Sequence, residues 1–216
     1  FHVTGVQTCA LPILGGHGGM PHKAFDPIVA ASSIVMALQT IISRNVDPQQ
    51  SAVVTVGAFN AGHANNVIPA KAKLELSVRA LDPKVRIDLE KRIKALVMSQ
   101  AESFGLTASI DWRPGYSVLV NSHAETEFAR NVAADFFGES GITRQGPALS
   151  GSEDFAFMLQ KKPGCYVFLG NGEGDHRAAG HGMGPCHLHN PSYDFNDKII
   201  PIGINYWVRL AQTFLK

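Results

Sequence analysis

Apolar side chains recur every three to four residues in two segments of the first half of the chain. The first segment runs from Ala24 to Arg44 and the second from Pro83 to Phe104. This spacing predicts two amphipathic helices, each with one face turned toward a core. Asp26 and Pro27 predict the start of the first helix, because aspartate caps helix N-termini and proline is favoured at the first helical position.

Strand patterns separate and follow these helices. Ser51 to Phe59 is rich in β-branched residues and predicts a strand covered on both faces. Lys71 to Ala80 alternates apolar and polar residues, which predicts a half-exposed strand with Arg79 on its polar face. Leu106 to Trp112 predicts a third strand. One more strand before Gly15 would complete the order βαββαβ of the split, ferredoxin-like unit.

That first strand would fall in residues 1–14, which do not resemble the sequence that follows them. The segment FHVTGVQTCALPI has no initiator Met and no basic region typical of a signal peptide. We therefore expect residues 1–14 to be foreign to the fold, such as translated adapter sequence. The alternative is an ordinary edge strand.

The second half of the chain predicts a different arrangement, with a boundary near Pro114. Glu125 to Phe137 and Ile199 to Leu215 are typical of helices, and Cys165 to Leu169 of a buried strand. Ser152 would cap a short helix that extends to Leu159. Alternating helices and strands indicate part of an α/β layer fold.

Composition limits the classes of function. Of the 216 residues, 45% are apolar and 17% charged, and the formal net charge is +1. This balance is typical of a globular protein and gives no electrostatic footprint for nucleic acid. No apolar run approaches the ~20 residues of a membrane span. Three scattered cysteines favour a reducing compartment, so we expect a cytoplasmic protein.

The glycine-rich segment GGHGGMPH surrounds His17. It lacks the Gly-Lys-Ser/Thr ending of a phosphate-binding P-loop. The glycines would let the backbone pass tightly around His17. The imidazole could then be part of a capped turn that enters the first helix, or it could donate a hydrogen bond to a developing oxyanion.

Four further residues have both a structural and a chemical interpretation. Asn66 could cap the turn between two strands or offer its amide to a substrate. Arg79 could be a solvated strand residue or bind a carboxylate through two hydrogen bonds. Gly151 and Ser152 could form a simple helix N-cap, or leave backbone N–H groups free to bind an anion.

His189 lies in the turn-rich sequence LHNPSYDFND, shortly after several other residues that can bind metals. Neutral imidazole is the commonest protein ligand for a divalent metal. A local zinc site formed with Cys186 and His187 is one possibility. Structural zinc sites usually require two spaced ligand pairs, and no second pair follows.

Taken together, six segments resemble one family. The segments are GGHGGMPH, DPIVAASSIVMALQTIISRNVDP, AVVTVGAFNAGHANNVIPAKAKLELSVRALD, GSEDFAFML, PGCYVFLGNG and LHNPSYDFND. In this order they are similar to the M20 metallopeptidases, and specifically to the amidohydrolase branch that includes hippurate hydrolases and indole-acetyl-amino-acid hydrolases. The resemblance runs from Gly15 to the C-terminus.

The resemblance implies a fold and a reaction. Residues 15–114 would form a ferredoxin-like dimerisation (lid) domain, and residues 115–216 the C-terminal half of a zinc-peptidase-like α/β catalytic domain. Family members hydrolyse the amide bond of N-acyl amino acids. Two divalent metals (Zn, Mn, Co or Ni) polarise the carbonyl and activate a water molecule. The resemblance also implies a homodimer formed through the lid.

It further implies a role for each candidate residue. His189 matches a metal ligand, and His17 matches a lid histidine that reaches the partner's active site and stabilises the oxyanion. Asn66 and Arg79 match lid residues that hold the substrate. Gly151 and Ser152 lie in a loop that lines the substrate pocket.

The family's remaining metal ligands and its general base precede the lid, and no segment here matches them. We therefore expect this chain to be a C-terminal fragment that is inactive alone, with unpaired sheet edges and an exposed apolar face in its second half. The alternative is a non-catalytic dimerisation or regulatory module. Retention of His17, Asn66, Arg79 and His189 argues against that alternative.

Overall fold

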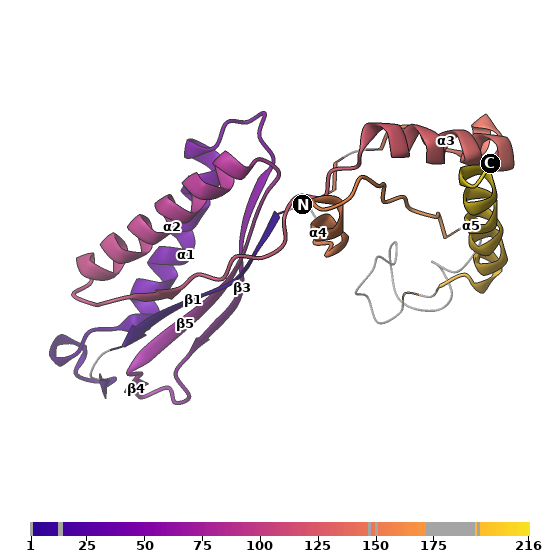
Figure 1. The fold of residues 1–216 in the computed structure, drawn as a ribbon. Coiled ribbons are helices and arrows are strands. Elements are labelled where there is room, and N and C mark those ends of the chain that lie inside the picture. The colour runs from indigo at the N-terminus through magenta and orange to yellow at the C-terminus, as the bar shows by residue number, and fades with distance from the viewer. Residues whose placement is uncertain (1, 13–14, 147, 150, 172–192, 194) are drawn as a thin grey trace. The chain divides into compact units, whose positions relative to one another are not determined.

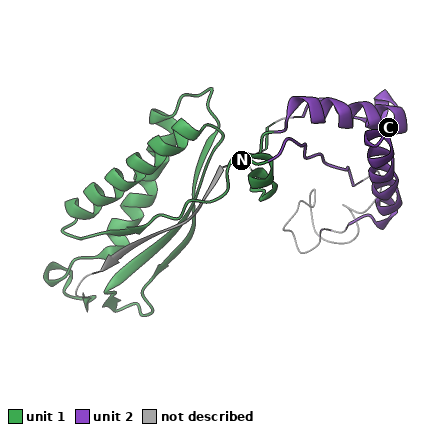
Figure 2. Ribbon diagram, viewed as in Figure 1, with its two compact units in different colours: residues 1–120, 148–161 green, residues 121–147, 162–216 purple. Residues whose placement is uncertain are grey.

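The computed structural model describes residues 2–12, 15–146, 148–149, 151–171, 193 and 195–216 (Figure 1). They form two compact units (Figure 2). The first comprises residues 1–120 and 148–161, and the second comprises residues 121–147 and 162–216. The predicted boundary at residue 114, between a lid and a catalytic domain, stays a prediction.

A four-stranded antiparallel sheet is the centre of the first unit. Its order is β3-β5-β1-β6, formed by β1 (His2–Pro12), β3 (Ala52–Ala61), β5 (Lys71–Ala80) and β6 (Ser109–Asp111). Helix α1 (Pro27–Asn45) connects β1 to β3, and α2 (Pro83–Ser103) connects β5 to β6. The described elements therefore have the predicted βαββαβ order. A two-stranded ladder is added by β2 (Gly16–His17) and β4 (Val67–Ile68).

Strand β1 lies inside the sheet, because it pairs with β5 on one edge and with β6 on the other. The alternative that this segment is an edge strand is therefore wrong. Pairing within the sheet does not report where a sequence comes from, so the foreign origin of residues 1–14 stays a prediction.

The two helices cover one face of the sheet. Asp26 caps α1 by accepting hydrogen bonds from the N–H groups of Ile28 and Val29, as the sequence predicted. Helix α1 contacts β3 and β5, while α2 contacts β5 and β1. The fully buried large side chains of this core are Ile34, Leu38, Ile41, Leu74, Leu76, Val78, Leu89, Ile93 and Val97.

Strand β3 is covered on one face only, which corrects the prediction of two covered faces. Val54 faces the helices and is 8% exposed, whereas its neighbour Val53 is 37% exposed. A run of β-branched residues does not distinguish these cases, because the coverage depends on where the helices pack.

Helix α1 also corrects the statement that no segment is long enough to span a membrane. Its 19 residues satisfy the length and composition of a candidate span. However, one side of α1 is buried against the sheet through Ala30, Ile34, Leu38 and Ile41. We therefore interpret α1 as a core helix.

The second unit is built on α3 (His123–Phe137) and α5 (Ile200–Phe214), with the 3₁₀ turns η2 (Glu139–Gly141) and η4 (Asp197–Ile199). Tyr206 joins the two helices, since its hydroxyl donates a 2.8 Å hydrogen bond to the Ala129 carbonyl. Burial of the Tyr206 ring raises the pKa of its hydroxyl.

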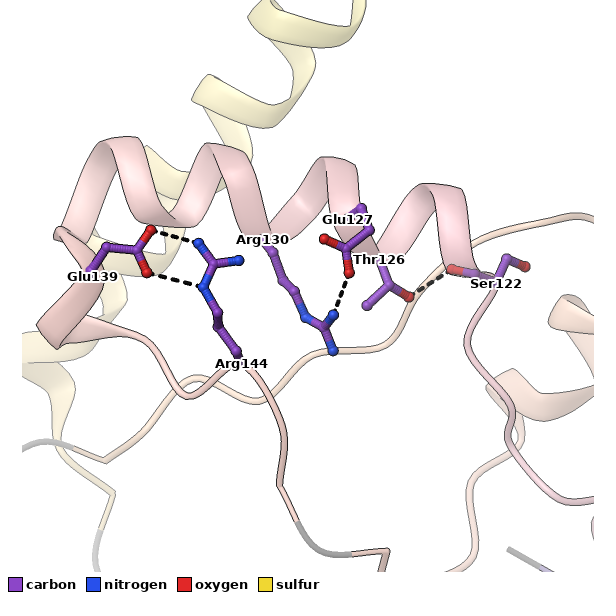
Figure 3. Close-up of polar contacts among 6 residues, drawn as sticks. All are labelled: Ser122, Thr126, Glu127, Arg130, Glu139 and Arg144. Carbon is purple, nitrogen blue, oxygen red and sulfur yellow. Dashed lines mark hydrogen bonds and ion pairs between the residues drawn. The ribbon is translucent and has the colours of Figure 1, made fainter.

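Polar contacts lie along α3 and just beyond its end (Figure 3). At the start, Thr126 donates a 2.6 Å hydrogen bond to the Ser122 carbonyl. Beyond the last turn, Arg144 forms two hydrogen bonds with the carboxylate of Glu139, at 3.0 and 2.5 Å. The guanidinium lowers the pKa of the Glu139 carboxyl, because it stabilises the charged form.

Residues 165–169 do not form a strand, which contradicts the prediction from their apolar run. The side chain of Asn121 bonds both the N–H and the carbonyl of Tyr166, at 2.8 and 2.9 Å. Gly164 in turn donates to the Ser122 hydroxyl at 3.1 Å. Side chains here satisfy backbone groups that a neighbouring strand would satisfy in a sheet.

Apolar side chains are exposed on this second unit, as the sequence predicted. Phe168 is 72% exposed, and its neighbours Val167 and Leu169 are exposed too. On α5, Trp207 is 71% exposed and Ile204 is also exposed. Large apolar surfaces of this kind usually mark interaction sites.

Candidate active-site residues

His17 and Asn66, which are distant in sequence, lie together at one end of the first unit. The short β2–β4 ladder pairs His17 with Val67, the residue after Asn66. The N–H of Gly18 donates a 2.8 Å hydrogen bond to the Asn66 carbonyl. The ladder therefore joins two of the predicted site residues in one exposed corner.

A tight turn holds the His17 ring. The N–H of Gly19 donates to His17 Nδ1 at 3.0 Å, and the N–H of Met20 donates to the His17 carbonyl at 2.8 Å. The imidazole itself is exposed. It can thus interact with a group from outside this unit.

Asn66 is also exposed. Its carbonyl accepts the bond from Gly18, while its side-chain amide makes no hydrogen bond with the part of the chain that the structure describes. The amide is therefore available to a ligand, as the chemical interpretation of Asn66 requires.

Arg79 lies near the opposite end of the sheet. It pairs with Val3 of β1 and Val53 of β3, close to the end of the ten-residue strand β5. At about 3.3 Å per residue, Arg79 is about 25 Å along β5 from the corner of His17 and Asn66. Its Nε donates to the Ser77 hydroxyl at 3.3 Å. One small molecule could not touch both places in the same chain.

Gly151 and Ser152 lie before a helix that starts later than predicted. Helix α4 (Phe155–Leu159) has Asp154 at its N-cap, so the prediction of Ser152 as the cap is wrong. The Phe155 N–H donates to the Glu153 carboxylate at 3.2 Å. This carboxylate takes one of the N–H groups at the helix start, and the predicted seat for an external anion stays a prediction. The place of Gly151 and Ser152 in a substrate pocket also stays a prediction.

The predicted metal ligand His189, like Cys186 and His187, lies outside the described residues. Among the residues that are described, no group of three His, Cys, Asp or Glu side chains could hold a metal ion. These residues therefore do not fit a metal centre by themselves.

Gly18 and Gly19 have roles that the glycine-rich sequence indicated only as a group. A Cβ on Gly18 would lie 2.9 Å from the Asn66 carbonyl oxygen, and one on Gly19 would lie 3.2 Å from the His17 ring. Contacts this short displace neighbouring atoms. The interpretation that glycines let the backbone pass tightly around His17 is confirmed.

Comparison with known proteins identifies the family. The model of peptidase family M20/M25/M40 matches residues 12–213. The chain belongs to this family. The predicted resemblance to M20 enzymes is therefore confirmed, and the match leaves out residues 1–11.

Relatives in the M20 family include several amidohydrolases. Hippurate hydrolase of Campylobacter jejuni is 43% identical over 94% of this chain and 50% of its own length. N-acetyl-L-cysteine deacetylase of Bacillus subtilis is 40% identical over 75% of this chain and 38% of its own length. IAA-amino acid hydrolase ILR1-like 4 of Arabidopsis thaliana is 34% identical over 93% of this chain and 45% of its own length. The chain thus spans about half the length of these relatives.

Solved structures share the fold of this chain. A crystal structure from methicillin resistant Staphylococcus aureus has a TM-score of 0.75 and 26% identity, and the match covers 97% of this chain and 51% of the other. The YXEP protein of Bacillus subtilis has a TM-score of 0.65 and 24% identity, and the match covers 96% of this chain and 49% of the other. It is described as a dinuclear metal binding peptidase of the M20 family. The second likeness supports the fold alone.

Proposed function

We propose that this chain is part of a metal-dependent amidohydrolase that hydrolyses the amide bond of N-acyl amino acids, with hippurate as a substrate. The observation that carries the proposal is the 43% identity to a hippurate hydrolase across 94% of the chain. The exposed corner of His17 and Asn66 supports it, since both side chains can reach an external substrate.

Each candidate residue then has a chemical task. The His17 imidazole donates a hydrogen bond to the oxyanion that forms when water attacks the amide carbonyl. The Asn66 amide binds a polar group of the substrate. The Arg79 guanidinium binds the substrate carboxylate, because its planar N–H groups match the two carboxylate oxygens.

We further propose that the parent enzyme holds two divalent metals (Zn, Mn, Co or Ni), with His189 as one ligand and with Gly151 and Ser152 beside the substrate pocket. The match of residues 12–213 to peptidase family M20/M25/M40 supports this assignment, because the resemblance to that family is what implies the two metals and these residue roles. Such ions polarise a carbonyl and lower the pKa of bound water. The described residues do not form this centre by themselves, and among them His17, Asn66 and Arg79 act on the substrate.

The separation along β5 supports a site that takes residues from two chains. If the His17 and Asn66 corner serves the partner's active site, the Arg79 that holds the same substrate belongs to the partner chain. We therefore propose a homodimer in which residues 15–114 act as the lid and residues 115–216 belong to the catalytic domain, in a cytoplasmic enzyme.

The outer edge of β3 and the adjoining α1 support a dimer surface. Among the described strands, β3 pairs only with β5, so its other edge is open. Its sequence AVVTVGAFNA contains no charge and no proline, which usually protect an open edge from pairing. The opposite edge strand, β6, has only three residues. Helix α1 has a single charged residue, Arg44, and exposes Met36 at 71%.

The dimer surface gives a first prediction. Met36→Glu should weaken self-association of this chain at least tenfold, because a buried charge at the interface would face its symmetry copy, and like-charge contacts cost several kcal/mol. Sedimentation equilibrium measures the dissociation constant. The matched control is Met98→Glu, which makes the same change at an exposed position of α2. A monomeric wild-type chain, or equal effects of both variants, would contradict the proposed surface.

The role of Arg79 provides the test of the proposed function. In the full-length parent enzyme, Arg79→Ala should raise KM for hippurate about 10- to 100-fold, since a charge-assisted bond is worth about 1.5–3 kcal/mol. Arg79→Lys should recover only part of this loss, because lysine cannot form the paired contact. Kinetics with hippuramide, which has an amide in place of the carboxylate, is the control.

Two results would reject this assignment. A parent enzyme that cleaves no N-acyl amino acid would overturn the reaction itself. An equal rise in KM for hippurate and hippuramide in Arg79→Ala would show that Arg79 does not bind the carboxylate.

A further inference from the structure

The contacts around His17 point to a fixed tautomer. We propose that the backbone N–H of Gly19 holds the neutral imidazole in the form that carries its proton on Nε2, with Gly18 and Gly19 as the positioning residues. This inference rests on the proposed role of His17 as a donor to the oxyanion, and it says how that donor is prepared before substrate arrives.

Hydrogen-bond chemistry leads to this assignment. A neutral imidazole has one nitrogen that donates and one that accepts. A backbone N–H can only donate, and that of Gly19 lies 3.0 Å from Nδ1. Nδ1 must therefore present its lone pair, and the proton must reside on Nε2. The other tautomer would bring two hydrogens together and lose the bond.

The direction of the remaining proton suits the proposed task. An oxyanion accepts hydrogen bonds and cannot donate one, so it requires an N–H from the ring. With Nδ1 bonded inside the turn, Nε2–H is the donor left for an external group. The exposed position of His17 leaves that group accessible to a second chain.

Three consecutive N–H groups make the turn rigid. Gly18 donates to the Asn66 carbonyl, Gly19 to the His17 ring, and Met20 to the His17 carbonyl. A side chain at either of the first two positions would displace the atoms that it meets. A Cβ would lie 2.9 Å from the Asn66 oxygen at Gly18, and 3.2 Å from both Nδ1 and Cε1 of His17 at Gly19.

The test is nitrogen NMR on this chain with ¹⁵N-labelled backbone and histidine, under alkaline conditions where imidazoles are neutral. We expect a coupling through the hydrogen bond between Gly19 N and His17 Nδ1, and chemical shifts of an Nε2–H tautomer without exchange. Gly19→Ala should remove the coupling and give mixed tautomers. Gly146→Ala, at an exposed position where a Cβ meets nothing within 4 Å, should leave both unchanged.

A proton found on Nδ1 in the wild-type chain would overturn the proposal, as would a tautomer ratio that Gly19→Ala leaves unchanged. If Gly19→Ala does not fold, the wild-type coupling and shifts still decide. In the parent enzyme, Gly19→Ala should lower kcat about tenfold with KM unchanged. This loss is smaller than the roughly 10²- to 10³-fold loss in kcat that follows complete removal of an oxyanion donor.

The outcomes separate this inference from the proposed function. A missing coupling, together with a large kinetic effect of His17→Ala, rejects the tautomer lock and leaves the oxyanion role intact. An observed coupling without any kinetic effect of His17→Ala keeps the lock and rejects the oxyanion role.

Discussion

Incubated alone with hippurate and either Zn²⁺ or Mn²⁺, this chain should release no benzoate above the uncatalysed background. Enzymes accelerate their reactions by at least about 10⁶-fold, and in a metal-dependent hydrolase the ion supplies the activated water. Metal affinity depends on several deprotonated ligands in fixed geometry. His189 alone does not meet that requirement, and the described residues add no cluster.

Chromatographic detection of benzoate gives the measurement, with the full-length parent enzyme as the positive control. A trace of a contaminating hydrolase could imitate activity. A His189→Ala variant of the chain reveals such a contaminant, because turnover from that source would not change. Clear turnover by the wild-type chain that His189→Ala or a chelator abolishes would contradict the prediction.

In the full-length enzyme, His17→Ala should lower kcat for hippurate by about 10²–10³, with little change in KM. This is the effect of removing one donor to an oxyanion, which forms only after the substrate is bound. Steady-state kinetics at saturating metal measures it. A rise in KM with unchanged kcat would instead assign His17 to substrate binding.

Mixed dimers then test which chain supplies which residue. Each His17→Ala chain keeps Arg79, and each Arg79→Ala chain keeps His17. If one site takes these residues from different chains, as their separation of about 25 Å along β5 indicates, a mixed dimer has one intact site. Mixing two weakly active variants should therefore restore activity.

The control mixture combines His17→Ala with Asn66→Ala. Because these residues share one corner through the Gly18 bond, both would serve the same site, and no intact site would form. Recovery in the control, or none in the test mixture, would contradict the shared-site geometry.

Much of the first unit could be predicted from the sequence. Helices α1 and α2 and strand β5 have the expected positions, because amphipathic spacing and the Asp26 cap act within a short stretch of chain. The second unit was harder to predict. Residues 165–169 have a strand-like composition, but their backbone groups bond to Asn121, which composition does not reveal.

The family can be identified from the sequence without any coordinates, since motifs in a fixed order are typical of M20 proteins. The sequence also determined which side chains are candidates for chemistry. The grouping of these side chains in space follows from the folded chain. Pairing of β2 with β4 brings His17 to Asn66, while the length of β5 separates both from Arg79. Such proximity depends on contacts between distant segments, and the pattern along the chain carries no direct record of those contacts.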